Sequence, residues 1–295
     1  MTIRWLAILT GAAMGLTACG ARPSTEAISS PSAVPAVSAA ASESPRPGEF
    51  GWYDTGNGRE LWIQCIGNGG PPIILEAGGG SDSSDWPPEI RALADQTTLC
   101  LYDRAGFGHS ADTAQPETMA GVVDDLAGLL AAARVPGPYL LVGGSLGGQI
   151  VLHYALTHEA DTAGLVILDT GFPSTDPGRD PLALLLTPEE YAQFQVDDAW
   201  AQATLAETAA LLHPLPGIPI RIVTATRVES DCWPGKDEAF CTEMARLNVE
   251  FQADWSSLSP SVEQVLVAAG HNLPWEATDI VLAEITIALE EIRAQ

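Results

Sequence analysis

The segment Gly143-Gly144-Ser145-Leu146-Gly147-Gly148 places a serine among glycines in a context that suits a nucleophile. The apolar run 139–142 precedes it, and the run 149–152 has a helical pattern, so the expected order is strand, turn and helix. Glycines two positions before and after Ser145 allow a strained turn that exposes its hydroxyl, a nucleophile elbow. The alternative is a glycine-rich turn without chemistry.

A serine hydroxyl needs an adjacent base, and histidine is the usual one. Of five histidines, only His271 follows the last predicted strand, after a glycine that lets the loop turn back over the sheet. His153 and His158 fall in the predicted helix after Ser145 and are interpreted as packing or surface residues. His109 either lines a pocket or has a structural role in its loop. His213 has no evident role.

An acidic side chain that orients the imidazole completes such a site. Asp169 directly follows the apolar run 166–168. Asp231 and Glu229 follow a later apolar run, 218–225, after a short gap. The residues alone leave these candidates open.

The elements that must position these residues alternate along the chain. Strands are predicted over 49–53, 60–66, 73–76, 98–102, 139–142, 163–169, 218–225 and 265–269. Helices are predicted over 86–94, from Thr118 onward, after Ser145 and at the C-terminus, where Val281, Ile285, Ala288, Leu289 and Ile292 share one face. This alternation favours a mainly parallel sheet with helices on both faces. Ser145, the pair Gly78-Gly79, Asp169 and His271 all come just after predicted strands, where active sites in such sheets lie.

The region from Pro173 to about Pro216 interrupts the alternation. Thr187-Pro188-Glu189-Glu190 has the form of a capping box with proline at the first helical position, and two helical stretches follow. We interpret residues 173–216 as a helical cap over the edge of the sheet. Its leucines Leu182, Leu184, Leu185 and Leu186 suit an apolar acyl pocket, although buried packing explains them equally well.

The N-terminal residues indicate export. Residues 1–18 carry Arg4, a short apolar run and small residues, which is typical of a signal peptide. The ending Leu16-Thr17-Ala18-Cys19 resembles the lipobox of bacterial lipoproteins, in which Cys19 becomes the lipidated first residue. Residues 19–47, rich in Ser, Ala and Pro, are predicted to be a disordered tether. Residues 48–295 then form one domain, anchored to the bacterial cell envelope.

Charge and cysteine content limit the partners and the compartment. A formal net charge of −25 argues against nucleic acid or an anionic lipid surface, because both would repel the protein. Five cysteines fit an oxidising compartment. With Cys19 lipidated, the remaining four, Cys65, Cys100, Cys232 and Cys241, allow three pairings. No His/Cys spacing suits zinc, and no cofactor or metal is expected.

Taken together, four motifs make residues 48–295 resemble the α/β-hydrolases. They are Leu75-Glu76-Ala77-Gly78-Gly79-Gly80, Tyr102-Asp103-Arg104-Ala105-Gly106-Phe107-Gly108, Gly143-Gly144-Ser145-Leu146-Gly147 and Ala269-Gly270-His271. The resemblance implies a mainly parallel eight-stranded sheet flanked by helices, with a short helical cap. It also implies a catalytic triad with Ser145 as nucleophile and His271 as base.

The resemblance further implies specific residue roles. The family's usual acid position, after the seventh strand, holds Thr226-Arg227-Val228, whereas the other known position, after the sixth strand, holds Asp169. Asp169 is therefore preferred over Asp231 or Glu229. The amides of Leu146 and Gly79 are expected to form the oxyanion hole, although Ala77 stands where the family often has histidine. Because the family's second and fourth strands are neighbours, the implied disulfides are Cys65–Cys100 and Cys232–Cys241.

The implied activity is hydrolysis of carboxylic esters. The expected substrate is a small molecule, and the reaction needs no cofactor. Alternatives that keep the serine are a peptidase of the proline-iminopeptidase type and a cofactor-free haloperoxidase-like enzyme. Haloalkane dehalogenases and epoxide hydrolases use a carboxylate nucleophile, which Ser145 argues against. A non-catalytic envelope binding protein on the same scaffold is the alternative of another class. The substrate and the oligomeric state do not follow from the sequence.

Overall fold

The computed structural model describes residues 50–56, 58–112, 118–228, 232–233 and 235–295. All of them belong to the unit Ser44–Gln295. The expected signal peptide, Cys19 and the expected tether lie outside these residues. No helix within the described ranges combines the length and the apolarity needed to cross a membrane.

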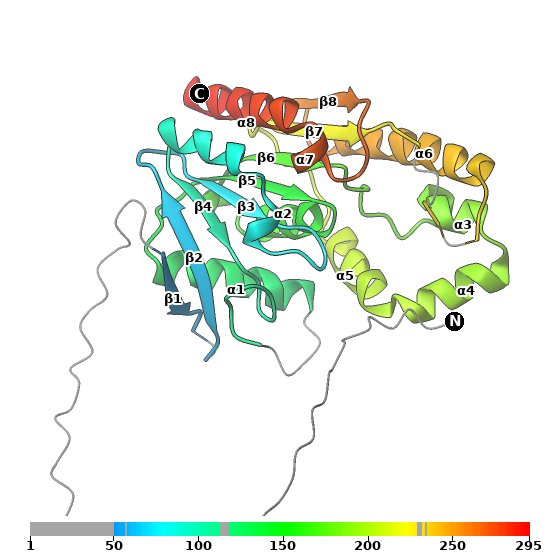
Figure 1. The fold of residues 1–295 in the computed structure, drawn as a ribbon, viewed down its shortest axis with the longest axis horizontal. Coiled ribbons are helices and arrows are strands. Elements are labelled where there is room, and N and C mark those ends of the chain that lie inside the picture. The colour runs from blue at the N-terminus through cyan, green and yellow to red at the C-terminus, as the bar shows by residue number, and fades with distance from the viewer. Residues whose placement is uncertain (1–49, 57, 113–117, 229–231, 234) are drawn as a thin grey trace, which may run out of the picture. The chain divides into compact units, whose positions relative to one another are not determined.

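Eight strands form one sheet in the order β1-β2-β4-β3-β5-β6-β7-β8 (Figure 1). They are β1 (Phe50–Asp54), β2 (Glu60–Ile66), β3 (Ile73–Glu76), β4 (Leu99–Tyr102), β5 (Tyr139–Gly144), β6 (Thr162–Leu168), β7 (Ile220–Ala225) and β8 (Val262–Val267). β2 runs antiparallel to both β1 and β4, and every pairing from β4 to β8 is parallel. The predicted mainly parallel eight-stranded sheet is therefore confirmed.

The antiparallel pairing of β2 with β4 sets Cys65 directly opposite Cys100. Their sulfur atoms form a disulfide with an S–S distance of 2.05 Å. A second disulfide joins Cys232 to Cys241. Both pairs are those that the resemblance implied.

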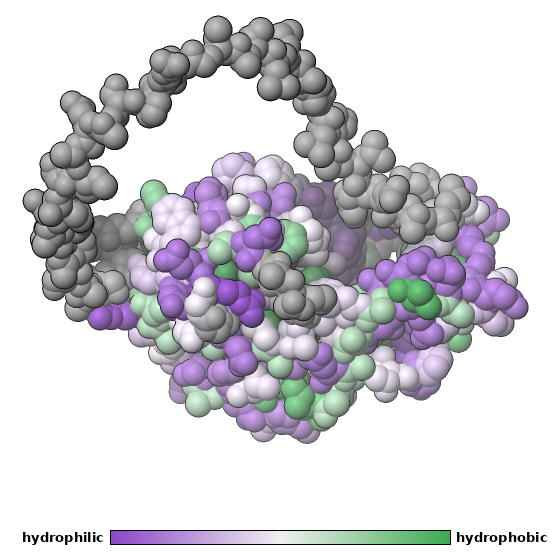
Figure 2. All heavy atoms as spheres, turned by 90° about the horizontal axis from the view of Figure 1, so that it is seen from below, coloured by the Kyte–Doolittle hydropathy of each residue, from purple (hydrophilic) through white to green (hydrophobic). Residues whose placement is uncertain are grey.

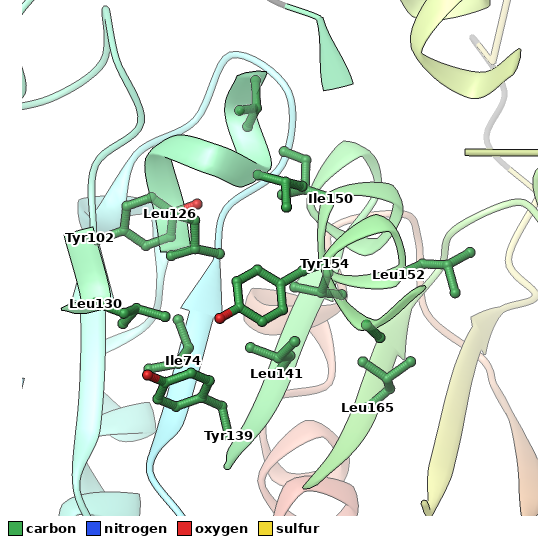
Figure 3. Packing of buried hydrophobic residues seen from close by; sticks show 14 of the residues in the cluster. Ile74, Tyr102, Leu126, Leu130, Tyr139, Leu141, Ile150, Leu152, Tyr154 and Leu165 are labelled. Carbon is green, nitrogen blue, oxygen red and sulfur yellow. The ribbon is translucent and has the colours of Figure 1, made fainter. Parts of the chain in front are cut away.

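Helices cover both faces of the sheet, and alternate strand residues point to opposite faces. Ile74 on β3 packs in the cluster with α1 (Met119–Ala132) and α2 (Leu146–Thr157), part of which Figure 3 shows. Its neighbours Ile73 and Leu75 pack in the opposite cluster with α8 (Thr278–Arg293). The central strands are mostly apolar because neither face meets water, although β3 ends in the buried Glu76 and β7 contains the buried Arg221. In Figure 2, hydrophilic side chains cover much of the face shown, and apolar ones occur in small separate groups.

The segment between β6 and β7 is helical, as predicted for the cap. It contains the short 3-10 helix η4 (Pro177–Arg179) and the helices α3 (Pro181–Leu185), α4 (Pro188–Asp197) and α5 (Ala199–Ala210). The capping box at the start of α4 is present: Glu190 N donates to Thr187 Oγ1 (3.3 Å), and Thr187 N donates to the Glu190 carboxylate (3.0 Å). α5 packs against α1 and α2, which fixes the cap to the main body (Figure 1).

Two of the predicted elements differ from expectation in helix type or by three residues at their start. The helix expected over 86–94 is a 3-10 helix, η2 (Pro88–Asp95), in a segment where Pro87 and Pro88 both lack an amide donor. The last strand, β8, begins three residues before the expected Val265 and ends at Val267, where Ala269 N instead bonds back to the Val267 carbonyl (2.8 Å).

One helix, α6 (Glu238–Gln252), was not predicted at all. It lies between β7 and β8 and is followed by the short helix η5 (Ala253–Ser257). Its signals were present in the sequence: Asp237 caps it by accepting from Phe240 N (2.9 Å), and apolar residues recur at helical spacing up to the buried Leu247 and Phe251. The remaining short elements are η1 (Ser83–Asp85), η3 (Glu159–Asp161) and α7 (Leu273–Glu276).

A buried histidine joins α2 to the cap. His153 is 3% exposed, and its Nδ1 lies 3.0 Å from Thr208 Oγ1 on α5. Burial lowers the pKa of His153, and the nearby carboxylates Glu207 and Asp124 offset only part of this effect. Burial in this contact therefore favours the neutral form of the imidazole.

We predict that this histidine makes the fold acid-sensitive. The pKa of His153 in the folded protein lies below the unfolded value of about 6.5. At pH values between these two pKa values, the unfolded chain binds more protons than the folded protein does. The free energy of unfolding therefore falls as the pH drops below about 6.5. His153→Asn keeps a polar atom near Thr208 but does not titrate. Thermal melts at several values between about pH 7 and pH 5 should therefore show a shallower decline of Tm in this variant.

His213→Asn is the matched control. The His213 side chain bonds to the Leu211 carbonyl and to Glu159, and these contacts raise its pKa, so its contribution has the opposite sign and is lost as the pH rises. In His213→Asn, the decline of Tm with falling pH should not become shallower than in the wild-type protein. Equal slopes for the wild-type protein and His153→Asn would contradict the prediction.

Candidate functional site

Ser145 stands at the turn between β5 and α2 in a backbone conformation that L-residues rarely adopt, with φ 53° and ψ −123°. The flanking glycines make this turn possible. A Cβ on Gly143 would lie 2.3 Å from the Gly147 carbonyl oxygen, and one on Gly147 would lie 2.5 Å from the Glu76 carbonyl oxygen. The glycine spacing is thus imposed by close approaches of the backbone around Ser145.

His271 follows β8 and contacts an aspartate that follows β6. Its Nδ1 lies 2.7 Å from Asp169 Oδ2. The two residues are 102 positions apart in the sequence, and they meet because the parallel strands end at the same edge of the sheet. The imidazole is 60% exposed and the carboxylate 5%, so a buried acid holds a histidine that faces the cavity.

The other oxygen of Asp169 accepts three hydrogen bonds. The donors are the backbone N–H of Ala225 at the end of β7 (3.1 Å), Gln252 Nε2 (2.9 Å) and Asn248 Nδ2 (3.3 Å). Gln252 is fully buried and also accepts from the Thr224 hydroxyl (2.6 Å). These contacts fix the carboxylate and leave Oδ2 for His271.

Asn248 and Gln252 belong to α6, and neither was predicted from the sequence as a residue of the site. Side-chain amides carry no motif that marks them as partners of a distant carboxylate. The helical periodicity around them was the available signal. The alternative acids, Asp231 and Glu229, lie outside the described residues.

The glycine loop after β3 lies against the turn at Ser145. A Cβ on Gly78 would be 3.7 Å from Ser145 Cβ, and one on Gly79 would be 3.6 Å from Leu146 Cβ. The backbone of this loop therefore approaches Leu146, the first residue of α2, whose amide comes before the hydrogen bonds of the helix itself. Amides of the two segments can converge on one point beside the serine.

Two cavities meet at this point. The larger, about 900 Å³, lies between the sheet edge and the cap, and apolar residues of its wall include Leu182, Leu205, Trp233 and Met244. The smaller, about 190 Å³, is bounded by the glycine loop and by polar residues such as Ser81 and Asn272. Ser145 and His271 are the residues that line both.

The leucines proposed for an acyl pocket are only partly in place. Leu182 lines the larger cavity, whereas Leu184 is 51% exposed and Leu186 is buried in packing. The remaining apolar wall includes residues of α5 and α6, and Trp233, which lies between β7 and α6. The disulfide between Cys232 and Cys241 also forms part of it.

The segment after β4 is hydrogen-bonded to the loop that follows β3. Asp103 accepts from the backbone N–H of Ser83 (2.8 Å) and of His109 (2.8 Å). Burial disfavours its charge, but the hydrogen bonds from Ser83 and His109 outweigh this effect and hold the pKa of Asp103 below its usual value. At Gly108, where φ is 52°, a Cβ would lie 2.3 Å from the Asp103 carboxylate.

The other histidines have structural contacts. His109 bonds to Asp103 through Nδ1 (2.8 Å) and stacks on Trp62 with ring centroids 4.8 Å apart. It does not line either cavity at Ser145, so the pocket interpretation was wrong and the structural one holds. His158 stacks on Tyr154 at the end of α2. Among the residues described, no cluster of three or more His, Cys, Asp or Glu could hold a metal ion.

Comparison with known proteins identifies the family. The sequence model of the alpha/beta hydrolase fold matches residues 71–214. A protein of Caulobacter sp. (strain K31), named "Putative carbamate hydrolase RutD", is 32% identical over 181 residues, which cover 55% of this chain and 67% of the relative. The chain belongs to the alpha/beta hydrolase fold family.

Other curated relatives match over a shorter part of their length. "Uncharacterized protein YqjL" of Bacillus subtilis (strain 168) is 32% identical over 50% of this chain and 56% of its own length. "Putative carbamate hydrolase RutD" of Azorhizobium caulinodans is 30% identical over 55% of this chain and 62% of its own. The chain thus spans less than two thirds of these two relatives.

Solved structures confirm the fold. An esterase from Thermogutta terrifontis has a TM-score of 0.55 and 21% identity, covering 83% of this chain and 99% of its own. The enol-lactonase from Burkholderia xenovorans LB400 has a TM-score of 0.54 and 18% identity, covering 81% and 99%. An epoxide hydrolase mutant from Bacillus megaterium has a TM-score of 0.55 and 13% identity, and the match covers 81% of this chain and 100% of that structure. At these identities the likeness shows the fold alone.

Proposed function

We propose that this protein is a serine hydrolase that cleaves carboxylic esters through an acyl-enzyme intermediate. The observation that carries the proposal is the meeting of two cavities at Ser145 and His271, with the His271 imidazole held by Asp169 (2.7 Å). Ser145 is the nucleophile, His271 the base and Asp169 the orienting acid. The amides of Leu146 and Gly79 form the oxyanion hole.

The proposed reaction has two halves. In the first, Nε2 of His271 takes the Ser145 proton while Oγ bonds to the ester carbonyl carbon, and the negative charge moves to the carbonyl oxygen. The amides of Leu146 and Gly79 stabilise that charge. The carbonyl then re-forms as the C–O bond to the leaving group breaks, and the imidazolium protonates the departing alcohol.

In the second half, water replaces the alcohol. His271 takes a proton from water, the hydroxyl adds to the acyl carbon, and the bond to Ser145 Oγ breaks as Oγ regains its proton. Asp169 holds Nδ1–H of the imidazole throughout, which keeps Nε2 available as base and stabilises the imidazolium.

The two cavities support an unsymmetrical substrate. A volume of about 900 Å³ falls within the range of sites for drug-sized ligands, whereas about 190 Å³ falls below it. We therefore propose an ester with one large apolar substituent in the cap cavity and one small substituent beside the glycine loop. The relatives named RutD favour a second candidate, a carbamate, whose carbonyl carbon would be attacked in the same way.

The nucleophile is tested by labelling the purified full-length protein with a fluorophosphonate and mapping the adduct by mass spectrometry. We expect modification at Ser145 and none in Ser145→Ala. His271→Ala and Asp169→Asn should slow labelling about 10³-fold or more, because the serine then lacks a correctly oriented base.

His213→Ala is the matched control and should label at the wild-type rate, since its side chain bonds to Leu211 and Glu159, away from both cavities. Loss of labelling in Asp231→Asn with retention in Asp169→Asn would assign the acid to Asp231. Absence of labelling in a folded wild-type sample would favour the non-catalytic binding protein.

The substrate shape is tested with two ester series, methyl esters of acids from acetate to octanoate and acetates of alcohols from methanol to octanol. We expect kcat/KM to rise in one series, by roughly threefold to fourfold per buried methylene, and to fall in the other. Leu205→Trp, which narrows the larger cavity, should abolish the rise.

Equal responses in the two series would contradict the unsymmetrical site. A matched methyl carbamate added to the favoured series distinguishes the second candidate. Faster turnover of the carbamate than of the ester would replace the ester assignment.

We also propose that the protein is exported and lipid-anchored at the bacterial cell envelope through Cys19. The lipobox-like ending at Ala18-Cys19 and the Ser-, Ala- and Pro-rich stretch after it support this proposal. In a bacterial host fed an alkyne fatty acid, the full-length chain should take up label and sediment with membranes. Cys19→Ala should do neither, whereas Ser30→Ala should behave as the wild-type chain. Label retained in Cys19→Ala would refute the anchor.

A further inference from the structure

A buried ion pair that the proposed mechanism does not use lies beneath the glycine loop. Glu76 is 0% exposed, Tyr102 3% and Arg104 6%. The Glu76 carboxylate accepts from the Tyr102 hydroxyl and from Nη1 of Arg104. Burying an ion costs free energy unless its hydrogen-bonding capacity is filled. The remaining donors of Arg104 are therefore expected to have acceptors.

Those contacts go to the loop that faces Ser145. Nη1 of Arg104 also donates to the Ala77 carbonyl (2.5 Å), and Nη2 donates to the carbonyls of Gly78 (2.5 Å) and Ser81 (3.3 Å). One guanidinium therefore holds three carbonyl oxygens of a single loop. Glu76, at the end of β3, fixes the guanidinium in turn.

The contact of Arg104 with the Gly78 carbonyl also fixes the direction of the Gly79 N–H. In a trans peptide, the C=O and the following N–H point in opposite directions. The Gly78 carbonyl points to Arg104, so the N–H of Gly79 points away from Arg104. Gly79 lies against Leu146, with 3.6 Å from its would-be Cβ to Leu146 Cβ, and it lines the smaller cavity together with Ser145.

We propose that the Glu76–Arg104 pair is the positioning device of the oxyanion hole: by holding the Gly78 carbonyl, Arg104 aims the Gly79 amide at the oxygen that becomes negative. This inference rests on the proposed serine hydrolase function. Arg104 does not touch the substrate and acts through the loop backbone. Without it, the two glycines would leave this peptide free to rotate.

The number of acceptors favours arginine over lysine. Arg104 contacts four acceptor groups through the two arms of a planar fork. Lysine offers three donors from one nitrogen and no planar geometry. Arg104→Lys therefore keeps the charge beside Glu76 and loses the orientation of the Gly78 peptide.

The test compares an ester with its thionoester, in which sulfur replaces the carbonyl oxygen and accepts hydrogen bonds more weakly. In Arg104→Lys of the full-length protein, we expect kcat for the oxygen ester to fall about 10- to 100-fold with KM within about twofold. The thionoester should lose less, so the oxygen-over-sulfur preference should shrink about tenfold. Tyr102→Phe removes a bond to Glu76 and leaves Arg104 in place, so it should keep the wild-type preference.

Each outcome decides the proposal. Equal losses for the two substrates in a folded Arg104→Lys would show that Arg104 serves the fold only, which overturns the inference. If Arg104→Lys does not fold, Glu76→Gln decides: a reduced preference supports the inference, and an unchanged one overturns it. A wild-type protein that neither labels at Ser145 nor hydrolyses esters refutes the proposed function itself, and this inference with it.

Discussion

The close approach of backbone segments around Ser145 is the constraint on which the site depends. The residue adopts φ 53°, a conformation that costs about 1–3 kcal/mol and persists only where the surroundings enforce it. Its N–H bonds to the Leu168 carbonyl (3.0 Å), and Gly147 packs against the Glu76 carbonyl too closely for any Cβ. The neighbouring strands β6 and β3 thus hold the turn from two sides. The serine hydroxyl therefore lies where the parallel strands end.

The same edge places the other two groups. Asp169 also has a positive φ, 42°, and its N–H bonds to the Val223 carbonyl (2.7 Å) on β7. Strand pairing therefore fixes the backbone of both the serine and the aspartate, while His271 comes from a loop whose Gly270 N–H bonds to Glu276 (2.9 Å). A parallel sheet supplies rigid starting points, and a loop supplies His271, the exposed side chain that exchanges protons with water and substrate in the proposed mechanism.

The sequence predicts this edge well because its signals are local. Apolar runs mark the strands, paired glycines mark the turn at Ser145, and a glycine before His271 marks the returning loop. The acid was ambiguous because Asp169 and Asp231 both follow strands, and only the spatial arrangement puts Asp169 within 2.7 Å of His271. The buried amides that hold Asp169 could not be predicted, since a glutamine 83 residues away carries no local sign of its partner.

Chemistry and substrate shape are divided between parts of the fold, and α6 joins them. The sheet edge carries the groups that react in the proposed mechanism, whereas the cap helices line the larger cavity. α6 does both: Met244 and Ala245 line the cavity, and Gln252, two turns further along, donates to Asp169. The disulfide from Cys241 ties the start of this helix to the segment after β7. A substitution in the cavity wall on α6 therefore falls on the helix that also holds the acid. A substitution on α5 falls on a helix that packs against α2, which begins at Leu146 beside Ser145.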